Sequence, residues 1–350
     1  MTPIACAWVL DSGGAGRGAW QGGLLHELMQ WTREHASYPL VSMGASAGGY
    51  AAADVATGTE HTVMKGWTAW GTSPSLEAFP LPPDVAAAWP PSRFRRHLHA
   101  SIRYVMGPTE VEGVFDGRAQ RKLLVFTSRV RRRDGRPMER ADLLRLFAIA
   151  ASRKWPRALK YRPRIFDIEP VVFATHLPQA LESEHVRPLT RSNYHCAIEA
   201  SCLVPIAMGP PLPPALVSPG RLYPRDETAT FIDGGFSLKM PMAAFADDPR
   251  FAALGQWAST ARTVVFCCDP KGHLWETSLR LRSLRDHPAV SSARTSGSLL
   301  VLHPDHDIEA GFLCLDPDVT MRTFARGQDQ GRRLLASDHV RRFLAGAPLN

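Results

Sequence analysis

The 350-residue sequence lacks several features that would place it in well-defined classes of protein. It has no CxxC pair, no apolar run long enough to span a bilayer, no internal repeat and no low-complexity tract. Residues Met1–Leu10 have no basic region before a short apolar stretch, so we expect no signal peptide. We therefore expect a cytoplasmic protein that meets membranes only peripherally.

The composition is that of a soluble globular protein, with 45% hydrophobic and 21% charged residues. Lys and Arg outnumber Asp and Glu by 41 to 33, and the net charge of +8 either favours an anionic membrane surface or serves solubility alone. No nucleic-acid-binding motif is present. The scattered cysteines are typical of reduced, buried thiols: Cys6, Cys196, Cys202, Cys267, Cys268 and Cys314.

Short apolar runs alternate with helical patterns, which predicts an α/β fold with a mostly parallel central sheet covered on both faces. A helix from Gly18 to His35 would bury Leu24, Leu25, Leu28 and Trp31 on one face, and a second helix is expected over 47–58. The expected strands are Ile4–Leu10, Pro39–Ser46, Val171–Thr175, Thr228–Asp233, Arg262–Asp269 and Ser298–Pro304.

The segment Thr72–Arg164 departs from this alternation. Pro74–Pro91 is proline-rich and should be irregular, and Arg129–Arg140 is expected to be a dense basic loop. The next stretch is either an amphipathic basic helix lying on a membrane or a helix packed on the core with a solvated charged face. Its apolar residues at helical spacing are Leu143, Leu144, Phe147 and Ala151.

A G-x-S-x-G pattern, Gly44-Ala45-Ser46-Ala47-Gly48, stands between an expected strand and an expected helix. This is the context of a nucleophile elbow, in which the serine occupies a strained turn and needs very small neighbours. The dipole of the following helix favours negative charge that develops at the serine. We predict that Ser46 is a nucleophile and that Gly44 and Gly48 permit its turn.

A glycine-rich loop follows the first expected strand and could hold either a phosphate or an oxyanion. Because it ends a strand and opens a helix, it should lie beside Ser46 at the same edge of the sheet. The backbone N–H groups of Gly13, Gly14 and Ala15 could then converge on a tetrahedral oxyanion. Arg17 would hold the loop or attract a phosphate.

Asp233 ends another expected strand and is followed by Gly234 and Gly235. Open parallel sheets carry their sites at the carboxyl ends of the strands, so this carboxylate is the best candidate for the base that a serine nucleophile needs.

In this order the three motifs resemble the patatin-like phospholipase family, over roughly Ile4 to Pro241. The segment Glu199–Pro211 is also similar to the family's small-residue helix and Ser-to-Pro segment. One departure is Ala15, where the family usually has a third consecutive glycine.

The resemblance implies a single patatin-like domain over 1–350, with a three-layer α/β/α fold and a Ser46–Asp233 dyad at the carboxyl edge of the strands. Residues 72–164 would cap the site and 246–350 would complete the sheet. The expected activity is hydrolysis of an acyl ester of a phospholipid or similar lipid, without a catalytic histidine, metal or organic cofactor.

Competing interpretations remain open from the sequence. Gly14-x-Gly16-x-x-Ala19 also fits a dinucleotide fingerprint, with Glu34 near the position of an acidic ribose ligand. The loop lacks the Lys-Ser/Thr pair of a P-loop. A Ser–Asp–His triad could instead use His303 or His306, and a catalytically silent membrane-binding module is a further alternative.

Four histidines are more simply explained as structural residues than as ligands or catalytic groups. "HPDHD", residues 303–307, could suggest a metal site, but a loop after a strand is the commoner source of such residues. His97 and His99 are expected at the surface.

Overall fold

The computed structural model describes residues 6–11, 13–35, 37–70, 78–83, 92–116, 121–151, 165–277, 282–311 and 313–346. Its sheet has eight strands: β1 (Cys6–Leu10), β2 (Val41–Ala45), β3 (Lys122–Arg132), β4 (Phe166–Ala174), β5 (Val186–Pro188), β6 (Thr230–Asp233), β7 (Arg262–Phe266) and β8 (Leu299–Leu302).

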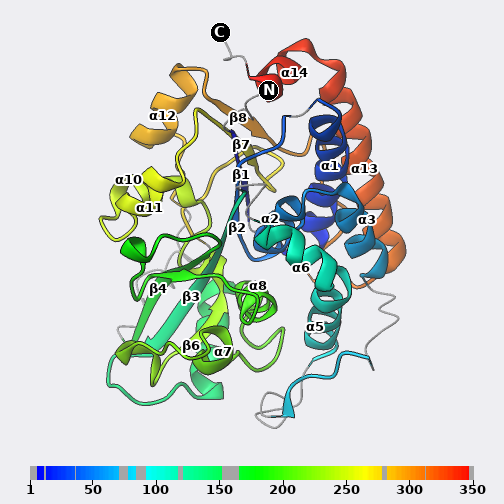
Figure 1. Ribbon diagram of the computed structural model, residues 1–350. Coiled ribbons are helices and arrows are strands. Elements are labelled where there is room, and N and C mark those ends of the chain that lie inside the picture. The colour runs from blue at the N-terminus through cyan, green and yellow to red at the C-terminus, as the bar shows by residue number, and fades with distance from the viewer. Residues whose placement is uncertain are drawn as a thin grey trace.

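The helices lie on both sides of this sheet (Figure 1). They are α1 (Gly14–Glu34), α2 (Ala47–Thr57), α3 (Glu60–Ala69), α5 (Arg93–Val105), α6 (Pro108–Phe115), α7 (Arg140–Ala151), α8 (Tyr194–Ser201), α9 (Pro214–Val217), α10 (Pro241–Asp247), α11 (Ala252–Trp257), α12 (Pro288–Thr295), α13 (Pro317–Ala336) and α14 (Asp338–Ala345). Short 3-10 turns are η3 (Gln179–Leu181), η4 (Pro224–Asp226) and η5 (Gly234–Phe236).

The strands follow one another in the order β5-β4-β3-β2-β1-β7-β8, and β6 pairs with β3. Only β4 and β6 run antiparallel to β3, whereas the other pairings are parallel. In Figure 1 α1, α3 and α13 cover one face, and α10, α11 and α12 cover the other. The predicted α/β fold with a mostly parallel central sheet is confirmed.

Alternating residues of β1 show how the two faces are built. Trp8 and Leu10 join the core cluster that contains Leu24 and Phe324, on the side of α1 and α13. Ala7 and Val9 join the opposite cluster, which contains Leu254 of α11. Because successive strand side chains point to opposite faces, one uninterrupted apolar strand supplies both layers of the core.

Helix α1 begins at Gly14, four residues before the expected start, so part of the glycine-rich stretch is helical. A Cβ atom at Gly23 would lie 1.9 Å from the carbonyl oxygen of Phe324 in α13. A Cβ atom at Gly327 of α13 would likewise lie 2.1 Å from the carbonyl oxygen of Trp20. These glycines let α1 and α13 pack backbone to backbone.

The central strand β3 was not among the expected strands, and its position corrects the basic-loop prediction. Arg129, Arg131 and Arg132 belong to β3 rather than to a loop. Residues 72–164 therefore include a strand of the sheet. Of this segment, 72–77, 84–91, 117–120 and 152–164 lie outside the described residues, and with them most of the proline-rich stretch.

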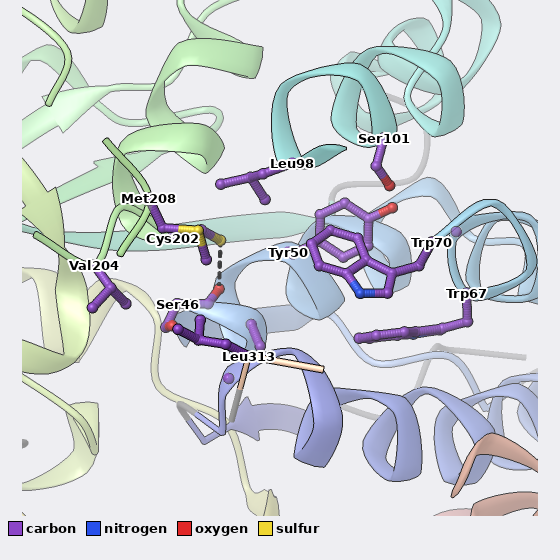
Figure 2. A pocket seen from close by; sticks show the side chains of 13 residues that line it. Ser46, Tyr50, Trp67, Trp70, Leu98, Ser101, Cys202, Val204, Met208 and Leu313 are labelled. Carbon is purple, nitrogen blue, oxygen red and sulfur yellow. Dashed lines mark hydrogen bonds between the residues drawn. The ribbon is translucent and has the colours of Figure 1, made fainter. Parts of the chain in front are cut away.

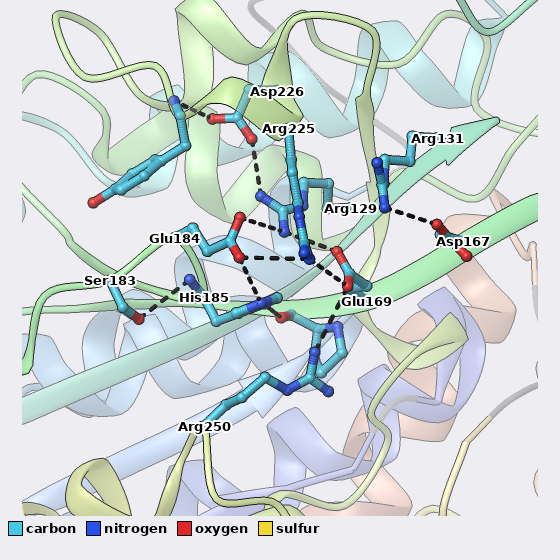
Figure 3. Close-up of polar contacts among 12 residues, drawn as sticks. Arg129, Arg131, Asp167, Glu169, Ser183, Glu184, His185, Arg225, Asp226 and Arg250 are labelled. Carbon is cyan, nitrogen blue, oxygen red and sulfur yellow. Dashed lines mark hydrogen bonds and ion pairs between the residues drawn. The ribbon is translucent and has the colours of Figure 1, made fainter. Parts of the chain in front are cut away.

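Three arginines of this segment are paired with carboxylates, and Figure 3 shows Arg129 and Arg131 among them. Arg129 is fully buried and contacts Asp226 at 3.2 Å, Glu169 at 2.8 Å and Glu184 at 3.3 Å. Arg131 and Arg133 both bind Asp167 at 2.8 Å. The charges thus hold β3 to β4 and to the turn before β6, and they do not form a free basic surface.

Helix α7 packs on the core, as one of the two alternatives for this stretch predicted. Leu143 and Leu146 are buried against Val130 and Phe166, whereas Leu144 is 47% exposed. Of the expected apolar stripe, Leu144 was therefore wrong, whereas Leu143 is buried and Phe147 packs against the core as expected. None of the described helices is both long and apolar enough to cross a membrane.

The cysteines are free thiols, as expected. Cys6, Cys202, Cys267 and Cys268 are buried, and the other two are partly buried. Burial raises the pKa of the Cys6 and Cys267 thiols to about 12, so both are protonated at neutral pH.

Asp54 in α2 is fully buried, and neither of its side-chain oxygens has a hydrogen-bond partner among the described residues. Burial raises the pKa of this carboxyl well above its ordinary value. Because the folded-state pKa is higher than the unfolded one, the stabilising contribution of protonated Asp54 is fully present at low pH. It is lost as the pH rises from the unfolded pKa of about 3.9 toward the folded one.

We therefore expect Asp54→Asn to stabilise the protein by about 1–3 kcal/mol at neutral pH, where ionisation of the buried carboxyl is costly. The gain should vanish in acid. Melting temperatures of both proteins measured across pH test this, with the exposed Asp329→Asn as a control. Parallel melting curves at every pH would refute the assignment.

Candidate functional site

The first two strands bring two loops together at one edge of the sheet. β1 pairs with β2 in parallel, and Leu10 lies opposite Gly44. Because parallel strands end at the same edge, the residues that follow Leu10 and those that follow Gly44 are neighbours. The glycine loop and the G-x-S-x-G turn therefore meet, as the sequence predicts.

The turn Gly44–Gly48, here called the elbow, carries Ser46 in a strained backbone conformation with φ 58° and ψ −134°. A Cβ atom at Gly48 would lie 2.2 Å from the carbonyl oxygen of Leu10, and one at Gly44 would lie 2.3 Å from that of Gly48. Only glycine fits at either position. Ser46 is the N-cap of α2 and is 3% exposed.

Strand β6 reaches the same place from the opposite direction. One side of β3 pairs first with β2, where Ala45 lies opposite Phe126, and then with β6, where Asp233 lies opposite Thr127. Since Phe126 and Thr127 are consecutive, β2 and β6 end head to head, one residue spacing of about 3.4 Å apart along β3. This register places Ser46 and Asp233 on two meeting strand ends.

Asp233 is 3% exposed, and its surroundings hold its position. Its backbone N–H donates to the carbonyl oxygen of Leu203 at 2.9 Å, and its Oδ1 accepts from the N–H of Gly235 at 2.8 Å. A Cβ atom at Gly234 would lie 2.0 Å from the carbonyl oxygen of Phe126, so the chain can turn away from β3 here only with glycine.

Ser201 and Cys202 support the elbow, although no motif in the sequence marks either residue. The backbone N–H of Ser46 donates to Ser201 Oγ at 2.9 Å, and Ser201 Oγ donates to the carbonyl oxygen of Phe126 at 2.7 Å. Cys202 Sγ donates to the carbonyl oxygen of Ser46 at 3.1 Å. Both residues lie in the segment Glu199–Pro211. The small residues of this segment were the only feature of the sequence that could have indicated a role at the site.

The glycine loop presents the beginning of α1 to the elbow. Gly13 is the N-cap without a side-chain cap, and Gly14 has a positive φ of 70° that favours glycine. The first N–H groups of a helix have no partner within the helix, so those of Gly14 and Ala15 are available to a ligand. Ala15 has helical backbone, which explains why alanine is tolerated there.

Asp11 links this loop to the segment after Asp233. Its Oδ2 accepts from the backbone N–H of Cys268 at 3.2 Å and from Lys239 Nζ at 3.3 Å. Asp11 and Lys239 are both buried. Arg17, in contrast, is exposed, and its guanidinium makes no ion pair with the described residues.

A pocket opens beside Ser46 and encloses about 520 Å³ of space not filled by atoms, including its mouth (Figure 2). Gly14, Ser46 and Ala47 lie at one side, so the N-termini of α1 and α2 both border it. Most of the remaining wall is apolar and comes from Trp67, Trp70, Leu98, Val204, Met208 and Leu313. We call this the elbow pocket.

The aromatic wall was missed at the sequence level, although its signal was present. Val63, Trp67 and Trp70 follow one another at i, i+4 and i+7, a spacing typical of one helix face. Trp70 is fixed by its Nε1–H, which donates to the carbonyl oxygen of Cys314 at 3.0 Å.

The dinucleotide alternative does not fit this geometry. Glu34 is the last residue of α1, about 30 Å from Gly14 along the helix axis, so both cannot contact one nucleotide's ribose and phosphates. The space next to Gly16 is also filled, because a Cβ atom there would lie 2.2 Å from the carbonyl oxygen of Gly311.

The histidine alternatives also fail. His303 follows β8, which lies three strand spacings, roughly 14 Å, from β2. His306 pairs with Asp305 at 2.6 Å and does not line the elbow pocket. Among the described residues no cluster of His, Cys, Asp and Glu could hold a metal ion.

His97 and His99 were expected at the surface, but both are buried in α5. His99 Nδ1 lies 3.0 Å from Glu199, and burial together with Arg93 and Arg96 lowers the pKa of His97. Helix α5 packs on α3 and α8, and this packing buries both side chains.

Comparison with known proteins identifies the family. Residues 9–246, more than half of the chain, match the family model described as Patatin-like phospholipase. The chain belongs to the patatin-like phospholipase family. No curated protein matches it significantly.

The match to the patatin-like phospholipase family includes the glycine loop, the elbow and Asp233. It ends before β7 and β8, which continue the sheet beyond β1. Membership suggests a lipid acyl hydrolase.

Proposed function

We propose that the protein hydrolyses acyl esters of lipids with a dyad of Ser46 and Asp233. The observation that carries this proposal is the head-to-head meeting of β2 and β6 on β3, next to an apolar pocket. In this arrangement the strand end that leads to Ser46 meets the strand end that carries the buried carboxylate of Asp233. The proposed dyad needs no histidine. Family membership supports the reaction class.

In the proposed reaction Ser46 Oγ attacks the ester carbonyl carbon while Asp233 accepts the hydroxyl proton. The tetrahedral intermediate collapses to an acyl-Ser46 ester, and the leaving alcohol takes the proton back from Asp233. Water then attacks the acyl-enzyme with Asp233 as base, releasing the fatty acid and restoring Ser46. A carboxylate is a weak base for a hydroxyl, so the buried surroundings must strengthen their interaction.

The negative charge that forms on the carbonyl oxygen would be held by the backbone N–H groups of Gly13, Gly14 and Ala15. This assignment rests on the uncapped start of α1 and on Gly14 bordering the same pocket as Ser46. The N-terminus of α2 adds a second helix dipole of the same sign. Two converging helix N-termini thus offset the weakness of the base.

The elbow pocket would receive the acyl chain, because its wall is mostly apolar. Helices α3 and α5 border the pocket through Trp67 and Leu98, and in this proposal they form its cap. The cap lies before β3, which is part of the sheet. Peripheral contact with an anionic membrane would rest on the net charge of +8 rather than on the paired arginines of β3.

The direct test is release of fatty acid from phosphatidylcholine and lysophosphatidylcholine in detergent micelles, followed by mass spectrometry. We expect release by the wild type and a loss of about 10³-fold or more in Ser46→Ala. Ser42→Ala is the matched control, since Ser42 is a buried serine of β2, the strand that leads to Ser46, and its hydroxyl donates to the carbonyl oxygen of Ala52. Equal release by wild type and Ser46→Ala would refute the proposal.

A further inference from the structure

The elbow pocket contains two hydroxyl groups that its apolar wall does not explain. Tyr50 of α2 and Ser101 of α5 both line it, and both side chains are more than nine-tenths buried. Figure 2 shows the two hydroxyls turned toward each other, to one side of the pocket and away from Ser46. A pocket that receives only a hydrocarbon chain gains nothing from such groups.

Burial raises the pKa of Tyr50 and a hydrogen bond with Ser101 opposes this rise, so the two hydroxyls contact each other. Neither hydroxyl has a further partner among the described residues. Ser101 lies in a helix but does not donate to the carbonyl oxygen one turn earlier, as helical serines commonly do. A bond between the two hydroxyls uses one O–H group as donor and leaves the other O–H group without an acceptor. A buried donor without a partner costs free energy, and one that faces a cavity indicates a polar ligand group beside the pair.

We propose that the elbow pocket selects acyl chains that carry an oxygen, a hydroxyl or keto group, part-way along the chain. This inference rests on the proposed function and specifies its substrate class. Tyr50 and Ser101 can each donate to a keto oxygen, and together they can donate to and accept from a hydroxyl. An unsubstituted chain in the same pocket leaves one of the two O–H donors without an acceptor.

The position of the two hydroxyls sets where the substrate oxygen must lie. The backbone N–H of Tyr50 donates to the carbonyl oxygen of Ser46, so Tyr50 lies one helical turn, about 6 Å, along α2 from the nucleophile. Its ring then extends away to α3, where a Cβ atom at Gly66 would lie 2.7 Å from Tyr50 Oη. The complementary oxygen therefore lies several carbons beyond the ester carbonyl rather than beside it.

The test compares p-nitrophenyl esters of one chain length, either unsubstituted or carrying a hydroxyl at successive carbons. We expect the wild type to prefer a mid-chain hydroxyl by about tenfold or more in kcat/KM, which corresponds to one or two hydrogen bonds. Tyr50→Phe and Ser101→Ala should each bring this ratio close to one. Tyr38→Phe is the matched control. Tyr38 lies outside the elbow pocket, and its buried hydroxyl has no hydrogen-bond partner among the described residues.

Binding to Ser46→Ala separates this inference from the proposed function. Calorimetric titration with a hydroxyalkanoic acid and with the matching alkanoic acid should show the same preference without turnover. Ester hydrolysis that depends on Ser46 but ignores the hydroxyl would overturn the inference alone, and so would a preference that Tyr50→Phe and Ser101→Ala both retain. Preferential binding without any hydrolysis by the wild type would overturn the proposed function and leave the inference standing.

Discussion

Replacing Asp233 with Asn is expected to lower kcat for lipid ester hydrolysis by about 10²–10⁴-fold, because the amide cannot accept the proton of Ser46. The substitution keeps the size of the side chain, and the Asn oxygen can still accept the N–H of Gly235 that Asp233 Oδ1 accepts now. KM should change little, since Asp233 does not line the elbow pocket. Steady-state kinetics on a soluble ester measure both constants.

Asp269→Asn is the control for a general electrostatic effect. Asp269 follows β7 at the same edge of the sheet and accepts from Trp275 Nε1 at 3.0 Å, away from β6. We expect this variant to retain most of its activity. If Asp233→Asn were as active as Asp269→Asn and melted at the same temperature as the wild type, Asp233 would not be the base.

Glu199→Gln is expected to destabilise the protein by about 3–5 kcal/mol, because it leaves a buried cation without its counter-charge. Glu199 in α8 is fully buried and pairs with Arg95, which is also fully buried, and with Arg103 at 2.9 Å. Burial alone would raise the pKa of Glu199, but the charge of Arg95 and the hydrogen bond with His99 hold it well below its ordinary value. Denaturant unfolding measures the loss.

The matched control is Glu112→Gln, which breaks an ion pair of the same type at the surface. Glu112 and Arg191 are both more than half exposed, so this variant should unfold at almost the same denaturant concentration as the wild type. A small effect of Glu199→Gln, comparable to that of the control, would contradict the role of this cluster in fixing α5 to α8. Since α5 carries Leu98 and Ser101, the cluster also fixes one wall of the elbow pocket.

The sequence predicts the parts of the fold in which local pattern and tertiary role agree. β1, β2, β6, β7 and β8 are short apolar runs followed by turns, and each was expected within a few residues. The elbow was predictable because its glycines and its strand-turn-helix context are local properties. The glycine loop lies close to the elbow because β1 and β2, the strands that lead into them, pair in parallel.

The meeting of β2 with β6 was not predictable, because it depends on β3. The run Leu123–Thr127 is apolar enough for a strand, but it leads into four arginines, and their charge suggested a solvated loop. Only the carboxylates of β4, of the loop before β5 and of η4, far apart in sequence, make burial of Arg129 possible. Ion pairs between distant segments leave no periodic signal.

The most direct test of the account is covalent labelling of Ser46. A fluorophosphonate probe should modify the wild-type protein once, and peptide mapping should place the adduct on Ser46 in the elbow. Ser46→Ala should remain unlabelled, and Asp233→Asn should label more slowly at the same serine. Labelling of Ser46→Ala to the wild-type extent, or an adduct on any other serine, would contradict the assignment of Ser46 as the nucleophile.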